Sequence, residues 1–321
     1  MKLLTLTALI LSIFSGSADS LNAQANNKAP AQKPKQPNKS KPKQQKPKVR
    51  DFRKKIVPFR QPAIELAGEL RKIAKEGSQV DLPAAAIDKQ GRGLVAYLEW
   101  NGKSDALRLA RTKGDGFEIL ATVVKSTVLH APALAVDGKG TVWVVWSETA
   151  DDQTVDLKAC SWEEKNGLGK TVTLADTDAA EAFAVAGTDS KGRVWVSWQS
   201  FRAGEGDVYA RFLDPKSGKW SKEIGVATQK GGDWAPSIAF DNKGNVWIAY
   251  DSSRGNEFNL NLARVDETDP GRVKEFPIAH SPKYEARTSI AATADGNGFW
   301  IAAERGKIKH GLDYRGHGNK T

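Results

Sequence analysis

A phrase of ten residues recurs along this chain at nearly constant spacing. It reads DNKGNVWIAY at residues 241–250, DSKGRVWVSW at 189–198 and DGKGTVWVVW at 137–146. Each phrase opens with an Asp-x-x-Gly step. Two weaker copies bring the number of such steps to five, and successive steps begin 49, 52, 52 and 54 residues apart. A period near 50 residues with strand-like content is typical of β-propeller blades, each of about four strands. The five steps begin at Asp88, Asp137, Asp189, Asp241 and Asp295.

The fourth copy shows how one unit is divided into strands. SIAF at residues 237–240 is short and apolar and predicts an innermost strand. NVWIAY at 245–250 predicts the second strand, and FNLNLARV at 258–265 alternates apolar and polar residues like a half-exposed third strand. KEFPIA at 274–279 is a weaker fourth strand. We therefore predict an all-β fold, a β-propeller of about five four-stranded blades.

The repeated tryptophan and aspartate suit structural tasks. Tryptophan stands at one position of the second strand in four copies, and leucine replaces it in the first copy. Repetition in every blade favours packing in the wedge between neighbouring sheets over stacking on one ligand. The repeated Asp is predicted to accept hydrogen bonds within its own turn. The wedge residues are Leu94, Trp143, Trp195, Trp247 and Trp300.

The fifth copy is short of outer strands, because the chain has little strand-like sequence after Arg305. The segment from Ile64 to Lys75 resembles the end of a blade and is a candidate for the missing outer strand. Such a strand would close the ring and remove an open sheet edge. The alternative is that this segment forms a short helix.

The N-terminal residues have the composition of an export signal and a linker. Residues 1–25 combine a basic start, a short apolar run and an A-x-A pattern, which predicts a signal peptide and a secreted or cell-envelope protein. Residues 26–55 form a predicted disordered Lys/Pro-rich linker, and residues 56–321 the propeller domain. Of the net charge of +10, residues 26–50 contribute +9, since they hold eight Lys, one Arg and no acid.

The globular part is therefore nearly neutral, and specific nucleic-acid binding is not indicated. The linker is either a solubilising spacer or a contact to an anionic envelope surface. It lacks the interleaved aromatic residues that stack on bases. The single cysteine, Cys160, excludes an internal disulfide and is predicted to be a small packed side chain. No cofactor-binding motif occurs, and neither His130 nor the pair His310 and His317 has the spacing of a metal site.

The pattern P-x-x-A-x-D-x-x-G-x-V-W-V-x-W resembles the repeats of bacterial secreted β-propellers, including sialidase-like (BNR) proteins. The sialidase Asp-box reads S-x-D-x-G-x-x-W, so the Asp-to-Gly spacing here is one residue longer and the Ser is absent. FRQP at 59–62 resembles the F-R-I-P of that family, whose Arg binds a substrate carboxylate, but it departs at Gln61. The resemblance implies the fold, whereas activity has to come from the site.

Propeller geometry gathers the inner-strand starts and the turns after second strands at one end. Variable polar loops on a rigid scaffold usually carry function. Arg202, Arg254 and Arg305 come from matching turns and are candidates for binding a carboxylate or sulfate; the alternative is solvated turn arginines. Trp234 and His130 are further candidate ligand-binding residues at this end.

Glu181 with Asp233 or Glu285 is a candidate pair of glycosidase carboxylates, against the alternative of ordinary loop acids. The leading prediction is non-catalytic binding of an extracellular polysaccharide or protein. The alternative is a sialidase-like or other glycan-cleaving hydrolase. A third possibility is a structural envelope protein in which the cationic linker is the active part. The sequence leaves open the ligand, the oligomeric state and whether the chain is a shortened relative of a longer propeller.

Overall fold

The computed structural model describes residues 72–74, 77–126, 128–150, 154–202, 204–254, 258–266, 269, 271–281 and 284–305. These residues form twenty β-strands and no α-helix, which confirms the predicted all-β class. Accordingly, no helix within these ranges is long and apolar enough to cross a bilayer. The predicted signal peptide, linker and FRQP segment lie outside the described residues, as does most of the predicted closing strand.

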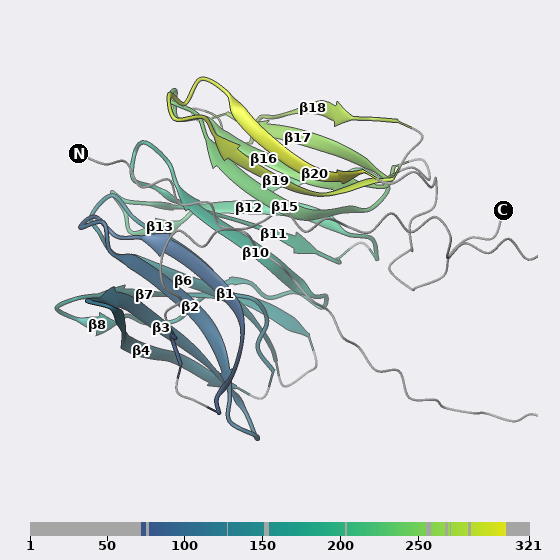
Figure 1. Cartoon of the computed structure of the whole chain (residues 1–321). Coiled ribbons are helices and arrows are strands. Elements are labelled where there is room, and N and C mark those ends of the chain that lie inside the picture. The colour runs from purple at the N-terminus through teal and green to yellow at the C-terminus, as the bar shows by residue number, and fades with distance from the viewer. Residues whose placement is uncertain are drawn as a thin grey trace, which may run out of the picture. The chain divides into compact units, whose positions relative to one another are not determined.

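The strands form five antiparallel sheets, which we number as blades 1 to 5 in chain order (Figure 1). Blade 1 contains β1 (Gln79–Ile87), β2 (Gly93–Trp100), β3 (Asp105–Lys113) and β4 (Gly116–Ser126). Blade 2 contains β5 (Ala133–Val136), β6 (Val142–Thr149), β7 (Val155–Glu163), β8 (Gly167–Leu168) and β9 (Val172–Ala175). Blade 3 contains β10 (Glu181–Thr188), β11 (Val194–Ser200), β12 (Asp207–Asp214), β13 (Lys219–Trp220) and β14 (Ile224–Ala227). Blade 4 contains β15 (Asp233–Phe240), β16 (Val246–Ser252), β17 (Asn259–Val265) and β18 (Val273–Ala279), and blade 5 contains β19 (Glu285–Ala292) and β20 (Phe299–Arg305).

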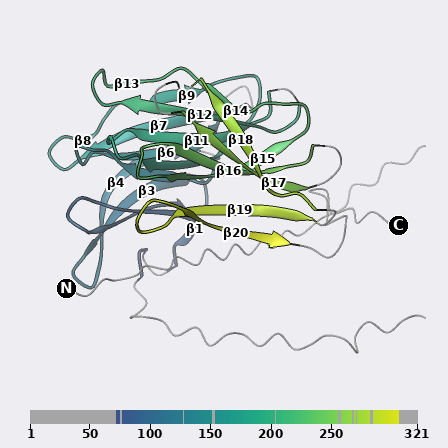
Figure 2. The ribbon, with the colours of Figure 1, turned by 90° about the horizontal axis from the view of Figure 1, so that it is seen from above.

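The first strand of each blade is its inner strand, and the inner strands are neighbours in space. β1 contacts β5, β5 contacts β10, β10 contacts β15 and β15 contacts β19. The view from above shows the β19–β20 hairpin beside the β15–β18 sheet, which it contacts mainly through β15 and β16 (Figure 2). This succession of radial sheets confirms the predicted propeller. The described part of blade 5 has only two strands, as its short sequence predicted.

Large side chains from the second strands fill the wedges between sheets. Leu94 and Trp195 are 1% and 0% exposed. Trp247 is half-buried, with ring centroids 5.7 Å from Phe276 and 5.3 Å from Phe299 of the next blade. Trp143 makes a T-shaped contact at 5.6 Å with Trp220 of blade 3. The wedge prediction is therefore confirmed for these four positions.

The prediction is wrong for Trp300, whose side chain is 74% exposed. The wedge residues of blades 2 to 4 contact the blade that follows in the chain, and no described sheet follows blade 5. Trp300 pairs with Ala291, as Trp247 pairs with Ala239, so its place in the strand is the predicted one. The described residues contain no sheet that packs over its side chain. Cys160, by contrast, is buried as predicted, and burial raises the pKa of its thiol.

The repeated aspartates hold their own turns, as predicted. Asp189 Oδ1 accepts hydrogen bonds from the backbone amides of Lys191 at 2.9 Å and Arg193 at 3.0 Å. Its Oδ2 accepts one from Trp195 Nε1 at 2.9 Å, which ties the turn to the wedge residue. The same two turn amides are bound by Oδ1 in the copies at Asp88, Asp137 and Asp241.

The fifth turn differs from the prediction, which placed its step at Asp295. Thr293 occupies the position of the repeated Asp, because its backbone amide bonds Gly298 O at 2.9 Å and its Oγ1 accepts from Gly298 N at 3.0 Å. Asp295 lies inside the turn, where its Oδ1 accepts from Asn297 N at 3.1 Å. With Thr293 as the start, the last spacing becomes 52 residues, equal to the two before it. The sequence pattern missed this turn start because it required an aspartate, whereas here a threonine hydroxyl accepts the turn hydrogen bond.

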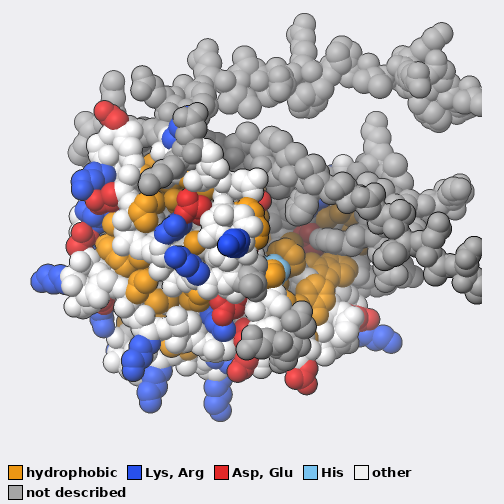
Figure 3. All heavy atoms as spheres, turned by 90° about the horizontal axis from the view of Figure 1, so that it is seen from below, with side chains coloured by type: hydrophobic (Ala, Val, Ile, Leu, Met, Phe, Trp, Pro, Cys, Tyr) orange, Lys and Arg blue, Asp and Glu red, His pale blue; other side chains and the backbone are white. Residues whose placement is uncertain are grey.

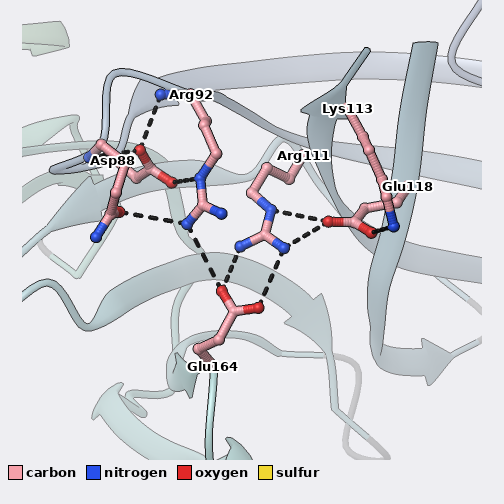
Figure 4. A network of polar contacts seen from close by, with 7 residues as sticks. Asp88, Arg92, Arg111, Lys113, Glu118 and Glu164 are labelled. Carbon is pink, nitrogen blue, oxygen red and sulfur yellow. Dashed lines mark hydrogen bonds and ion pairs between the residues drawn. The ribbon is translucent and has the colours of Figure 1, made fainter.

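An ion-pair network joins blades 1 and 2 near the Asp88 turn (Figure 4). Arg111 is 6% exposed, and its guanidinium contacts Glu118 of its own blade and Glu164 of blade 2. Arg92 reaches Asp88 at 2.7 Å and Glu164 at 3.6 Å. Hydrogen bonds from Lys113 and Arg111 lower the pKa of Glu118 to about 2. All charges in this network are paired, so it couples two blades and offers no unpaired group to a ligand.

Replacement of Asp189 by Ala should destabilise the protein more than replacement of Asp137 by Ala. Asp189 is 5% exposed and accepts from two amides, Trp195 and Arg193 Nε, whereas Asp137 serves its two turn amides. Buried donors left without a partner cost about 1–3 kcal/mol each, so we expect a loss of about 3 kcal/mol for Asp189→Ala and about 1 kcal/mol for Asp137→Ala. Urea unfolding measures the free energy of unfolding of both variants. Equal losses would contradict the inference that Asp189 stabilises the protein by bonding Trp195.

Candidate functional site

The two ends of the blade stack carry different features. At one end the Asp turns of neighbouring blades touch, since Gly138 N donates to Gly192 O at 3.0 Å and Asn242 N to Gly296 O at 3.1 Å. We call the opposite end, formed by the inner-strand starts and the turns after second strands, the loop face. Positive and negative side chains are interspersed with hydrophobic ones on the face shown in Figure 3. That face has no broad area of one charge sign.

Each inner strand except β5 carries a strained bulge near the loop face. The residues with left-handed backbone are Leu82 (φ 49°), Phe183 (φ 55°), Ala235 (φ 48°) and Arg287 (φ 58°). Each lies at a register shift between the first and second strands of its blade. Such conformations cost about 1–3 kcal/mol for non-glycine residues and persist only where the surroundings fix them. None of these four residues is a glycine, so sequence analysis did not predict the left-handed positions.

Side chains of the preceding blade hold two of the bulges. Asp251 of blade 4 accepts from the Arg287 amide at 2.7 Å and from the Thr288 amide at 3.2 Å. Gln199 of blade 3 accepts from the Ala235 amide at 3.3 Å. At these two positions the strained backbone is therefore held by contacts between blades.

The predicted arginine and carboxylate candidates pair with each other inside single blades. Arg202 Nε lies 3.0 Å from Glu181 Oε1, and Arg202 Nη1 lies 2.6 Å from Glu223 Oε2. Glu181 is 0% exposed and also accepts from Trp198 Nε1 at 2.6 Å and Ser200 Oγ at 3.0 Å. The carboxylate is thus fully bonded within blade 3. We call this acid–arginine pairing the latch.

Blade 4 repeats the latch, and blade 5 pairs an acid with an arginine from another position. Arg305 lies in β20 opposite Glu285, where blades 3 and 4 have serine, so the prediction of a turn matching that of Arg254 is wrong. Arg254 bridges Asp233 and Glu275, both at 2.8 Å, and Arg305 Nε lies 3.0 Å from Glu285 Oε1. Asp233 and Glu285 are 0% and 2% exposed. The structure therefore gives these arginines carboxylate partners of their own, and it places the three acids in the interior. A catalytic role for Glu181, Asp233 and Glu285 gains no support from this geometry.

His130 lies at the start of blade 2, where its backbone amide bonds Ser147 O at 2.9 Å. Burial lowers the pKa of its imidazole. Its Nε2 is buried without a hydrogen-bond partner in the described structure. No group of three or more His, Cys, Asp or Glu side chains among the described residues is placed to hold a metal ion.

Trp234 lines a pocket at the loop face, a cavity of about 580 Å³ between blades 3 and 4. Its indole stacks on Phe258 at 5.9 Å, and Phe258 contacts Tyr284 at 5.0 Å. An aromatic row thus extends from the pocket towards blade 5. We call the cavity the Trp234 pocket, and it is lined by Phe201, Gly204, Glu205, Gly206, Lys230, Gly231, Gly232, Trp234 and Ser253.

Two glycines make room for the indole. A Cβ on Gly232 would lie 2.0 Å from Trp234 Cζ2, and one on Gly206 would lie 2.3 Å from Trp234 Cδ1. The ring therefore lies directly against backbone, which only glycine permits. Sequence analysis found Trp234 but missed the other lining residues. The glycine-containing runs GEGD at 204–207 and GGDW at 231–234 are the signal that points to them.

A buried carboxyl group adjoins the pocket behind Gly206. Burial, and then the charges of Asp233 and Glu205, raise the pKa of Asp207, which is 5% exposed. Burial also raises the pKa of Asp233, although Arg254 beside it favours the carboxylate. Clustered carboxyls with raised pKa values occur at functional sites more often than elsewhere.

No protein-family profile matches the chain, and no curated protein matches it at a significant level. Solved structures do match it. A protein of unknown function from Dyadobacter fermentans has a TM-score of 0.53 and 12% identity, over 71% of this chain and 76% of that one. An α-L-arabinanase of Penicillium chrysogenum, complexed with arabinobiose, has a TM-score of 0.53 and 13% identity, over 70% and 74%.

A family GH93 α-L-arabinofuranosidase of Fusarium graminearum, also with arabinobiose, has a TM-score of 0.52 and 15% identity, over 71% and 75% of the two chains. At identities this low the likeness establishes the fold and does not carry residue roles across. The chain is a multi-blade β-propeller.

Asp251 makes the junction between blades 4 and 5 sensitive to pH. It is 2% exposed, and burial raises its pKa to about 6. Arg287 and Glu304 of blade 5 are the charged groups facing it. Because the folded state binds this proton more tightly than the unfolded state, the contribution of Asp251 to stability increases as pH falls through 6. Between pH 7 and pH 5 we expect a gain of about 1 kcal/mol from this group.

Urea unfolding of the wild type and of Asp251→Asn at pH 5, 6 and 7 measures that gain. The variant should lose this part of the pH dependence, whereas Asp178→Asn, which changes an exposed loop-face acid, should keep it. Identical pH profiles for the wild type and Asp251→Asn would contradict the assignment.

Proposed function

We propose that this protein binds an extracellular glycan in the Trp234 pocket without cleaving it. The observation that carries the proposal is the flat indole held against two glycine backbones in a polar cavity of about 580 Å³. A sugar ring has apolar C–H faces and a rim of hydroxyl groups, so it needs an aromatic surface together with hydrogen-bonding groups. Binding pockets generally combine such an apolar surface with a few placed polar groups.

The polar groups of the pocket come from both blades. Glu205 and Lys230 line it with opposite charges, and Ser253 adds a hydroxyl group. Glu205 Oε2 also accepts from the Gly231 amide at 2.7 Å, which fixes the carboxylate at the rim. Phe201 is 37% exposed and supplies a second aromatic ring. This set suits a neutral sugar better than a strongly anionic one, because one acid balances one base.

The solved structures support a glycan at the level of the fold. The Penicillium and Fusarium propellers named above are both in complex with arabinobiose. Binding is favoured over cleavage here because the three predicted catalytic carboxylates are buried and bonded to arginine. Hydrolysis is the second candidate. It is favoured by Asp207 alone, whose raised pKa would allow it to hold a proton beside the pocket.

Trp234→Ala should weaken glycan binding by a factor of about 30 or more, as expected for removal of a central aromatic contact. Gly232→Ala should have a similar effect while leaving the indole in the chain, because the new Cβ displaces the ring. Isothermal titration with soluble arabinan, xylan and other neutral envelope polysaccharides, after a glycan-array screen, measures both variants. Trp300→Ala, which removes an exposed tryptophan elsewhere, and Gly116→Ala, at an open glycine, are the matched controls.

Unchanged affinity in both pocket variants, with the controls also unchanged, would show that the ligand binds elsewhere. Release of reducing sugar by the purified protein, lost in Asp207→Asn and retained in Asp178→Asn, would replace binding by hydrolysis. Absence of any glycan ligand on the array would overturn the proposal as a whole.

The proposal includes a location outside the cytoplasm. The predicted export signal at 1–25 and the cationic segment at 26–50 are the features that support a secreted or envelope location. Deletion of residues 26–50 should leave glycan affinity unchanged and reduce salt-sensitive association with cells. A loss of glycan affinity on that deletion would mean that the cationic segment itself is the binding element.

A further inference from the structure

Blade 1 departs from the repeat where blades 3 to 5 have the latch. Strand pairing places Val80 opposite Glu99, just as Glu181 faces Ser200 and Asp233 faces Ser252. Val80 thus occupies the position of the buried acid. Asn101, two residues after Glu99, occupies the position of the latch arginine, which follows Ser200 and Ser252 by two residues. The acid and the arginine of the latch are therefore both replaced in blade 1, and an aliphatic residue likewise takes the acid position in blade 2, where Leu129 pairs with Glu148.

Large hydrophobic side chains at this end of blade 1 are open to solvent. Val80, Leu82 and Trp100 are 43%, 37% and 38% exposed, and all three line one cavity of about 440 Å³. Leu98 and Leu129 form its buried apolar floor. Leu82 also has the left-handed backbone with φ 49°, a cost that its partial burial does little to offset. We call this cavity the blade-1 pocket.

Two carboxylates stand in the lining of the same pocket. Asp81 Oδ1 accepts from the Leu82 amide at 2.7 Å, and Asp105 Oδ2 lies 3.5 Å from the Leu129 amide. Among the described residues each carboxylate has one such hydrogen bond, from a backbone amide, so its second oxygen is available to a ligand. A ligand that enters the pocket therefore meets branched apolar side chains, one indole and two negative charges.

We infer that the blade-1 pocket binds a peptide segment in which a large apolar side chain stands next to Lys or Arg. The apolar side chain would pack on Val80, Leu82 and Trp100, and the cation would pair with Asp81 and Asp105. A cationic peptide complements this lining better than a neutral glycan, because Val80 and Leu82 pack on apolar side chains while the two carboxylates pair with a cation. This inference concerns a site separate from the Trp234 pocket and does not depend on glycan binding.

Fluorescence anisotropy with three labelled nine-residue peptides tests the inference on the full chain. One probe alternates Lys with Leu and Phe, a second has Glu in place of every Lys, and a third has Ser in place of every Leu and Phe. The first should bind at micromolar concentration, with affinity that falls as salt is raised. The other two should bind at least tenfold more weakly, because each lacks one of the two complementary features.

Two variants with matched controls locate the binding. Leu82→Gly should weaken the first peptide about tenfold while the melting temperature stays equal or rises, because glycine accepts the left-handed backbone. Phe183→Gly makes the same change at the equivalent strained position of blade 3 and should leave peptide affinity unchanged. The double variant Asp81→Asn with Asp105→Asn should lose most of the salt dependence, and Asp178→Asn should not.

Equal binding of the Lys and Glu peptides, or wild-type affinity in both Leu82→Gly and the double Asn variant, would overturn the inference. So would the absence of measurable binding by the wild type, or a neutral glycan that competes for this pocket. Glycan affinity at the Trp234 pocket, measured in the same variants, should not change. Failure of one site is thereby distinguishable from failure of the other.

Discussion

The packing of each second strand against the following sheet is the contact on which this structure depends. Trp195 is completely buried between blades 3 and 4, and Trp247 lies between Phe276 and Phe299. Burial of such large side chains supplies most of the free energy that holds separate sheets together. It also arranges the blades in chain order, so that all inner strands start at one end. The loop face is a consequence of these filled wedges.

Polar contacts then fix the two ends of the blades. The Asp turns are held by their own carboxylates, and the loop ends of blades 3 to 5 by the latches of Arg202, Arg254 and Arg305. Blades 1 and 2 lack the latch and have an aliphatic residue at the acid position, Val80, which is exposed, and Leu129, which is buried. Residues that repeat therefore serve structure in this chain. The two candidate pockets lie where the repeat is broken or where a blade inserts extra glycines.

Sequence analysis predicted the blades well and the site poorly, for related reasons. Alternation, turn residues and the 50-residue period are local properties, so strands such as β16 and β17 fall where they were predicted. The fifth turn was wrongly placed because Thr293 substitutes for Asp. Trp300 matched the pattern but lacks a described neighbouring sheet. The roles of Glu181 and Asp233 depend on side chains about 20 residues away, which no local pattern reveals.

By itself the sequence determined the class of fold, the number of repeating units and the structural task of the aspartate turns, because these follow from short-range periodicity and turn chemistry. Only the tertiary structure decided which charged residues are paired, which backbone positions are strained and where cavities remain. Those outcomes depend on contacts between strands and between blades. From the sequence, Arg254 could be a solvated arginine in a turn. The structure shows that it bridges Asp233 and Glu275.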